Sequence, residues 1–147
     1  MINRDIFITT NAKQTRKLGG MLARELRGGE IICLTGELGS GKTTFAQGVL
    51  AELGAKGPHT SPTFLVMKQY KLKTTAQKSK LESAYHMDAY RVGVQDILDL
   101  GWEEITFDKN NIVIVEWAEK IRAIIPKRAI WLRFEHLGGD GRKISMK

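Results

Sequence analysis

Apolar and polar positions follow two patterns along this chain, and these patterns predict strands and helices in turn. Short apolar runs predict strands at 6–8, 30–35, 64–70, 83–91, 111–117, 129–135 and 142–146. Longer segments with apolar residues three and four positions apart predict helices at 9–27, 44–53, 92–107 and 118–125. Helices placed between strands are typical of an α/β fold with a mainly parallel sheet.

The helical periodicity also predicts which side chains face the core. These are Leu18, Met21, Leu22 and Leu26 of the first helix, Phe45, Val49, Leu50 and Leu53 of the second, and Ile97, Leu98, Leu100 and Trp102 of the third. Glycines 28 and 29 are expected to end the first helix, because glycine favours helix C-termini. Gly101 interrupts the third helix, and Pro126 stops the fourth.

The segment between the second predicted strand and the next helix is Gly36-Glu37-Leu38-Gly39-Ser40-Gly41-Lys42-Thr43. It fits the phosphate-binding P-loop, G-x-x-x-x-G-K-[ST], at every fixed position. The glycines let the main chain approach phosphate oxygens, and the loop N–H groups and the helix N-terminus attract the anion. We expect Lys42 to reach the β- and γ-phosphates, Thr43 to offer its hydroxyl to Mg²⁺, and Thr44 to touch a phosphate. The sequence therefore predicts nucleotide binding.

This motif defines the predicted fold. We expect one three-layer P-loop α/β domain over residues 1–147, with a mainly parallel central sheet and a C-terminal hairpin. ATP should lie at the carboxyl ends of the strands.

Two further strand ends carry polar side chains. The buried-type strand at 111–117 ends in Glu116, which could ligate the metal, hold a metal-bound water or orient the attacking water. The alternative is a solvated glutamate. The strand at 83–91 places His86, Asp88 and Tyr90 on one face, with Arg91 following. This end is either part of the site or an ordinary polar surface.

Two loops leave alternatives open. The hydroxyl-rich stretch 60–64 follows the first helix after the P-loop, where many P-loop proteins sense the γ-phosphate; it could equally be a surface loop that caps an element. Residues 68–80 contain five lysines and no acidic residue. They form either a solvated hairpin turn or a contact with RNA or a partner.

Composition adds broad limits. The net charge of +7 favours acidic partners such as a nucleotide, RNA or an acidic protein face. Cys33 is the one cysteine, so no internal disulfide can form. We expect Cys33 to be a small core residue and the protein to be located in the reducing cytoplasm. We expect no signal peptide and no membrane contact, because no apolar run is long enough to span a bilayer.

Four motifs follow one another along the chain: G-E-L-G-S-G-K-T-T at 36–44, T-S-P-T-F at 60–64, H-M-D-A-Y-R at 86–91 and V-E-W-A-E-K at 115–120. In this order they resemble the bacterial TsaE (YjeE) family, small P-loop ATPases of tRNA threonylcarbamoyladenosine biosynthesis. The resemblance implies a subunit that binds and hydrolyses ATP and works with TsaB and TsaD. Its ATPase activity is expected to be weak without these partners. It implies formation of N6-threonylcarbamoyladenosine at position 37 of tRNAs reading codons beginning with A. TsaD, not this chain, would transfer the group.

The resemblance also implies site residues. Catalytic roles are implied for Lys42, Thr63, Asp88 and Glu116, and a metal site for Thr43 and Glu116. Nucleotide contacts are implied for Gly36, Glu37, Leu38, Gly39, Ser40, Gly41, Lys42, Thr43, Thr44, Asn11, Thr15, Glu119 and Arg142. Tyr90 and Arg91 would couple to a partner.

The sequence departs from the family pattern at two places. The lysine-rich stretch after Tyr70 is longer and more basic than the family needs, so a tRNA contact through Lys68–Lys80 is a hypothesis from charge alone. Lys120 stands where arginine is frequent. Two other functions stay open: a small-molecule kinase, which needs an acceptor pocket and a mobile lid, and a non-catalytic nucleotide switch.

Overall fold

The computed structural model describes residues 5–62, 65–72 and 80–146. Its strands are β1 (Ile6–Thr9), β2 (Ile31–Gly36), β3 (Met67–Lys71), β4 (Ser83–Asp88), β5 (Asn111–Glu116), β6 (Ile130–His136) and β7 (Arg142–Met146). Its helices are α1 (Ala12–Glu25), α2 (Lys42–Glu52), α3 (Val94–Asp99), α4 (Trp102–Phe107) and the 3₁₀ helix η1 (Ala118–Ile124).

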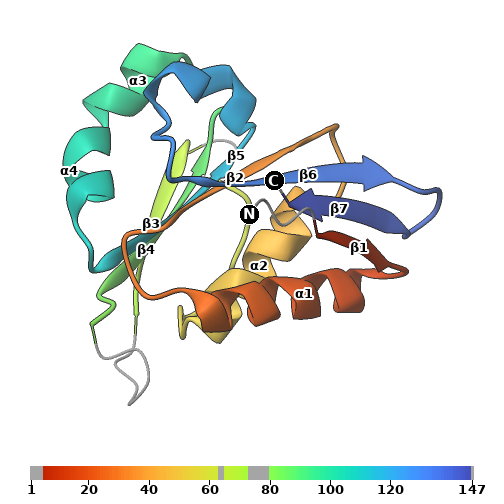
Figure 1. Ribbon diagram of the computed structural model, residues 1–147. Helices are drawn as coiled ribbons and strands as arrows, with labels where there is room; N and C mark the ends of the chain where they lie inside the picture. The colour runs from red at the N-terminus through yellow and green to blue at the C-terminus, as the bar shows by residue number, and fades with distance from the viewer. Residues whose placement is uncertain (1–4, 63–64, 73–79, 147) are drawn as a thin grey trace.

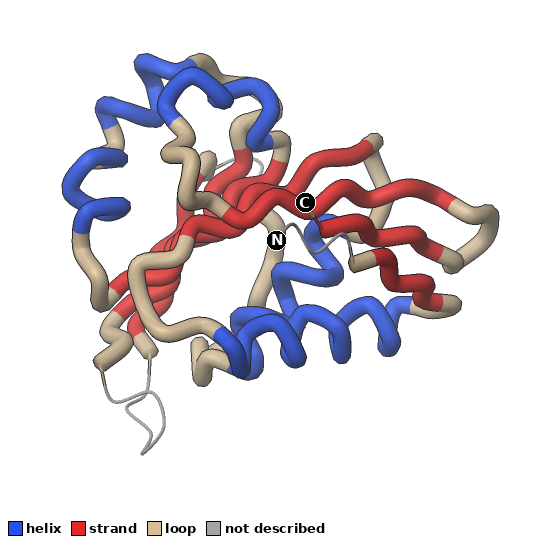
Figure 2. Tube along the Cα trace, viewed as in Figure 1, coloured by secondary structure: helices blue, strands red, loops and turns tan. Residues whose placement is uncertain are grey.

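The strands form one sheet in the order β1-β7-β6-β2-β5-β4-β3. The central strands β6, β2, β5 and β4 run parallel, whereas β3 at one edge and β7 with β1 at the other pair antiparallel. Figure 1 shows α1 and α2 on one face of the sheet and α3 and α4 on the other, and Figure 2 shows the sheet in red between these helices in blue. The predicted α/β fold and C-terminal hairpin are confirmed, and the parallel part of the sheet is its centre.

The buried faces of β2 and β5 explain why the centre is parallel. Every residue of β5 is buried, and so are the first four residues of β2, as expected for strands covered by helices on both faces. Cys33 in β2 is fully buried, and burial raises the pKa of its thiol to about 12, with Arg122 acting weakly in the opposite direction. Cys33 is therefore a core residue, as predicted.

The predicted core face of the first helix is partly wrong. Leu26 is buried, but Met21 is 49% exposed, and the buried residues of α1 are Thr15, Gly19, Gly20 and Ala23. A side chain added at Gly19 would place its Cβ 2.2 Å from the carbonyl oxygen of Phe45. Because α1 crosses α2 at backbone contact, small residues face the neighbour, and the larger apolar residues lie beside this crossing.

Gly48 of α2 makes the same close approach from the other side. An alanine Cβ there would lie 1.9 Å from the carbonyl oxygen of Arg16, so Gly48→Ala must push the helices apart. We expect Gly48→Ala to lower the free energy of unfolding by about 2 kcal/mol, the cost of overpacking. At Gly20 the nearest atoms to a new Cβ lie at 3.5 Å or more, so Gly20→Ala should stabilise by roughly 0.5–1 kcal/mol. Urea denaturation of both variants tests these two expectations. Equal denaturation midpoints for Gly48→Ala and Gly20→Ala would contradict the close contact of α1 and α2 at Gly48.

Three other element boundaries differ from the sequence prediction. β3 begins at Met67, because Val66 has a positive φ of 65° and its N–H bonds the Pro62 carbonyl in a turn; Phe64 lies outside the described residues. β4 ends at Asp88. The segment 92–107 forms two helices separated by Gly101 at φ 94°, and Leu100 is 37% exposed, not packed in the core.

In the described ranges, none of the helices combines the length and apolarity needed to cross a membrane.

Candidate functional site

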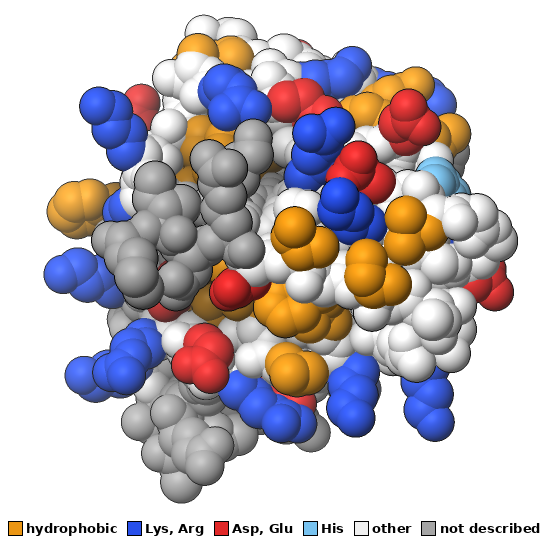
Figure 3. Space-filling model, turned by 45° about the vertical axis from the view of Figure 1, so that its right-hand side comes forward, with side chains coloured by type: hydrophobic (Ala, Val, Ile, Leu, Met, Phe, Trp, Pro, Cys, Tyr) orange, Lys and Arg blue, Asp and Glu red, His pale blue; other side chains and the backbone are white. Residues whose placement is uncertain are grey.

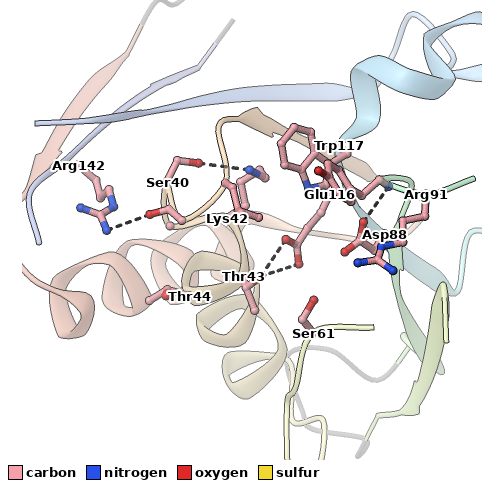
Figure 4. Close-up of a pocket in the computed structure, with 14 residues that line it drawn as sticks. Ser40, Lys42, Thr43, Thr44, Ser61, Asp88, Arg91, Glu116, Trp117 and Arg142 are labelled. Carbon is pink, nitrogen blue, oxygen red and sulfur yellow. Dashed lines mark hydrogen bonds between the residues drawn. The ribbon is translucent and has the colours of Figure 1, made fainter. Parts of the chain in front are cut away.

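The site lies where the parallel strands β2, β4 and β5 end, as expected for an open α/β sheet. The pocket there encloses about 360 Å³, within the range of small-molecule sites. Its lining comprises Leu38, Gly39, Ser40, Gly41, Lys42, Thr43, Thr44, Ser61, Asp88, Tyr90, Arg91, Glu116, Trp117 and Arg142. Figure 4 shows these side chains around the pocket, and they come from five parts of the chain: residues 38–44, 61, 88–91, 116–117 and 142. The structure therefore assembles most of the residues that the motifs indicate.

The P-loop has the backbone that its glycines allow. Gly36 has φ 137°, and a Cβ there would lie 2.4 Å from the Phe134 carbonyl oxygen, so only glycine fits. Gly41 caps α2 with φ 103°, a left-handed conformation, and it brings no side chain that could cap the first N–H groups. The start of this 11-residue helix thus presents N–H groups and the positive helix end to an anion.

Lys42 folds back onto this loop. Its Nζ donates to the carbonyl oxygens of Gly36 (2.5 Å) and Glu37 (2.8 Å) and lies 4.2 Å from the centre of the Trp117 ring. Burial lowers the pKa of Lys42, and the negative charges of Glu116, Glu119 and Asp88 act in the opposite direction. The ammonium is thus shielded from solvent at the point where the loop N–H groups gather.

Glu116 connects two strands to the P-loop. Thr43 Oγ1 donates toward its carboxylate, 2.8 Å from Oε1 and 3.1 Å from Oε2, and Figure 4 shows both contacts. On its other side, His86 Nε2 lies 2.6 Å from Oε2. Glu116 is 3% exposed, so its charge is compensated by these partners instead of by water.

The donor set fits a Mg²⁺ ion. The Thr43 hydroxyl and the Glu116 carboxylate are hard oxygen ligands of the kind that Mg²⁺ takes. No cluster of three or more His, Cys, Asp or Glu side chains suited to a metal occurs among the described residues. A cation here would therefore take its other ligands from phosphate oxygens and water, which is the usual way for Mg²⁺ at a nucleotide.

Asp88 lies beside Glu116 because the two residues are register partners at the ends of β4 and β5. It is 4% exposed, and it accepts the N–H of Tyr90 at 2.9 Å. Both carboxylates border the pocket that Lys42 enters. This places a second acid at the edge of the pocket, which agrees with the first of the two alternatives that the sequence left open for this strand end.

Two aromatic rings cover one side of the pocket. Tyr90 and Trp117 have ring centres 4.7 Å apart, and Trp117 has a positive φ of 59° directly after Glu116. Lys120 donates to the Tyr90 carbonyl (3.1 Å) and lies 4.9 Å from the Tyr90 ring. Tyr90 and Arg91, predicted as contacts to a partner, thus also line the pocket.

Arg142 reaches the P-loop from the C-terminal hairpin. It donates to the carbonyl oxygen of Gly39 at 3.0 Å and to those of Gly139 and Gly141 at 2.8 Å each. Arg142, which is 103 positions from Gly39, thus borders the pocket, and its predicted contact with the nucleotide stays a prediction.

Other predicted residues lie elsewhere. Asn11 caps α1 by accepting the Gln14 N–H (2.8 Å), and Thr15 bonds the Thr9 hydroxyl (2.7 Å), while neither appears in the pocket lining. Glu119 borders a neighbouring hollow on the far side of Trp117. Their nucleotide contacts stay predictions. Thr63 lies outside the described residues, although Ser61 of the same loop lines the pocket.

His86 is the residue that sequence reasoning left without a role. Its position two residues before Asp88 put it on the same strand face as that acid, which was a usable signal. Its bond to Glu116 depended on the pairing of β4 with β5, which the sequence did not give.

Comparisons with known proteins agree with this arrangement. The family model for "Threonylcarbamoyl adenosine biosynthesis protein TsaE" matches residues 9–144. A Bacillus subtilis protein named "tRNA threonylcarbamoyladenosine biosynthesis protein TsaE" is 32% identical over 93% of this chain and 81% of its own length. A protein of the same name from Streptomyces coelicolor is 35% identical over 85% of this chain and 81% of its own length. A crystal structure of Bacillus subtilis YdiB, 27% identical, superposes with a TM-score of 0.76 over 99% of this chain and 86% of that one.

Proposed function

The chain belongs to the TsaE family, and from this premise we propose that it is an ATPase subunit of tRNA threonylcarbamoyladenosine biosynthesis. It acts with TsaB and TsaD in the formation of N6-threonylcarbamoyladenosine at position 37 of tRNAs reading codons beginning with A. It binds ATP with Mg²⁺ in the cytoplasm, as one domain, and is not the transferase. Family membership supports nucleotide binding and a role in this pathway.

One observation carries the ATPase proposal. Thr43 at the end of the P-loop lies 2.8 Å from the Glu116 carboxylate, and both border the pocket that holds the Lys42 ammonium. This brings a phosphate-binding loop, the Lys42 ammonium and two hard oxygen ligands, the Thr43 hydroxyl and the Glu116 carboxylate, into one site. The same arrangement is what phosphoryl transfer to water requires, since that reaction depends on positioning and charge stabilisation.

Each residue has a task in this proposal. The loop N–H groups and Lys42 bind the β- and γ-phosphates, so Lys42 exchanges its present carbonyl partners for phosphate oxygens. Thr43 and Glu116 would hold Mg²⁺, and the ion would supply positive charge beside the phosphates. Asp88 orients water near the metal, and the rings of Tyr90 and Trp117 keep bulk water from that side.

The protein alone should be a slow ATPase. The arginines that border the pocket, Arg91 and Arg142, come from a turn and a hairpin, and Arg142 is engaged with loop carbonyls. TsaD would supply or organise the missing transition-state contacts, because a correctly placed arginine or water-orienting group accelerates such reactions by several orders of magnitude.

The direct test is ATP hydrolysis by the purified chain, alone and with TsaB and TsaD. We expect a slow rate alone and at least a tenfold faster rate with the partners, as for an active site completed in trans. Equal rates with and without partners would contradict the partner-dependent ATPase. Bound ATP without hydrolysis in either case would favour the nucleotide switch.

A tRNA contact through Lys68–Lys80 is a second, separate proposal. Lys71 and Lys80 are exposed, Lys68 bonds the Thr60 hydroxyl at 2.9 Å, and residues 73–79 lie outside the described part of the chain. The test measures tRNA binding by the assembly of this chain with TsaB and TsaD at several salt concentrations. Lys71→Gln with Lys80→Gln should weaken tRNA binding and flatten its salt dependence, while neutralising Lys13 and Lys17 on α1 controls for overall charge. Equal losses in both variants would leave the stretch without a specific role.

A further inference from the structure

We propose that His86 is a positioning residue for Glu116: its imidazole holds the Glu116 carboxylate in the orientation that faces Thr43. This inference rests on the proposed function, since that is where Glu116 acquires its metal. It gives a role to His86, which the motif H-M-D-A-Y-R contains but to which the sequence assigned none.

The position of His86 follows from strand pairing. In the parallel pair β4–β5, His86 is the register partner of Ile114, and Asp88 is the partner of Glu116. His86 therefore lies one pleat behind the strand end, on the same face as Asp88, where its ring reaches the glutamate from the side. The 2.6 Å separation of His86 Nε2 and Glu116 Oε2 shows that it does so.

His86 cannot act by touching a ligand. It is 0% exposed and does not border the pocket, whereas Glu116 does. Any effect of the imidazole on a nucleotide or a cation must pass through the carboxylate that it contacts. This geometry is that of an outer-shell partner, which fixes the orientation of a ligand without binding the metal.

The second ring nitrogen of His86, Nδ1, supports the view that the bond to Glu116 is the reason for a histidine at this position. His86 Nδ1 is buried, and among the described residues it has no hydrogen-bond partner. An unsatisfied buried polar atom costs free energy that an apolar side chain would avoid. The bond from Nε2–H to Glu116 is the one hydrogen bond that the ring makes in the described structure, and it offsets this cost.

Glu116 also needs such a partner more than a shorter acid would. Glutamate has one more rotatable bond than aspartate, so its carboxylate can turn away from Thr43. Thr43 Oγ1 lies 2.8 Å and 3.1 Å from the two oxygens and selects neither strongly. By bonding Oε2, His86 fixes the carboxylate so that Oε1 faces the threonine. Removing the imidazole should loosen the Mg²⁺ site but leave the P-loop intact.

The experiment measures the affinity for a non-hydrolysable ATP analogue in Mg²⁺ and in EDTA, and takes their ratio as the Mg²⁺ enhancement. We expect His86→Met, which keeps volume and loses the donor, to reduce this enhancement about tenfold, as outer-shell changes do. Affinity in EDTA should not change. His86→Gln places an N–H near the Nε2 position and should restore most of the enhancement, whereas the shorter His86→Asn should not.

A double-mutant cycle separates positioning from general damage. If His86 acts through Glu116, then His86→Met should have no further effect in a Glu116→Gln background. Met87→Leu, on the opposite face of β4, controls for disturbance of the strand. If His86→Met does not fold, the comparison of Gln with Asn at position 86 gives the same answer.

The outcomes distinguish the two levels of inference. An unchanged Mg²⁺ enhancement in a folded His86→Met or His86→Asn variant overturns the positioning role, and so does additivity in the cycle. An unchanged enhancement in Glu116→Gln alone overturns the metal role of Glu116, and with it the proposed site. A loss in Glu116→Gln without a loss in the His86 variants overturns the positioning role only.

Discussion

Lys42→Met is expected to lower ATP hydrolysis by at least about 100-fold, the usual loss when one charge-stabilising donor leaves a transition state. The ammonium now donates to the carbonyl oxygens of Gly36 and Glu37 and lies over the Trp117 ring, so it is already inside the loop that would hold the phosphates. Methionine keeps the aliphatic stem beside Trp117 and removes the charge. The measurement is the rate of phosphate release with TsaB and TsaD present, together with nucleotide affinity.

Lys120→Met is the matched control. Its ammonium lies 4.9 Å from the Tyr90 ring and 6.0 Å from the Trp117 ring, so this variant also removes a cation from the aromatic pair. Lys120 does not border the pocket, and its loss should change the rate by less than about threefold, within the range of a surface substitution. Similar losses in the two variants would mean that Lys42 acts by stabilising the rings and not by binding phosphate.

The P-loop and the acid at the end of β5 were predictable because each depends on local sequence. The motif requires a strand before it and a helix after it. The apolar run of β5 locates the end of that buried strand to within a few residues, and Glu116 is the acid that stands there. Glu116 and Thr43 then come together because parallel strands end at the same edge of a sheet. The shared edge can be predicted without the strand order, whereas the 2.8 Å contact also requires that β5 lie next to β2.

Tertiary contacts explain what the sequence could not predict. Helical periodicity identifies large apolar residues, so it selected Met21 and overlooked a glycine crossing that brings two backbones into contact. The strand order places β4 next to β5, and only this pairing brings His86 to Glu116. The approach of Arg142 to the P-loop likewise depends on where the C-terminal hairpin packs, and the family resemblance implied only a contact of Arg142 with the nucleotide.

Glu116→Gln is expected to lower hydrolysis by at least about 100-fold while nucleotide affinity in EDTA stays within a few-fold of the unsubstituted chain. Glutamine has the same shape, and it can still bond Thr43 and His86, so the fold should persist. The lost charge removes a metal ligand and one of the negative groups that raise the pKa of Lys42. Phosphate release and calorimetric nucleotide binding measure the two effects separately.

Glu119→Gln is the control for charge alone. Glu119 also acts on the pKa of Lys42, but it is exposed and borders the hollow on the far side of Trp117, so its neutral variant should keep most of the activity. A large loss would instead support the predicted nucleotide contact of Glu119. The Glu116 variant then separates the ATPase cycle from the nucleotide switch when tRNA modification is followed over many turnovers. If hydrolysis is a required step of each cycle, modification must stall after the first turnover, because that step is blocked. A nucleotide switch would continue, since bound ATP is all that it requires, and continued modification would therefore contradict the ATPase cycle.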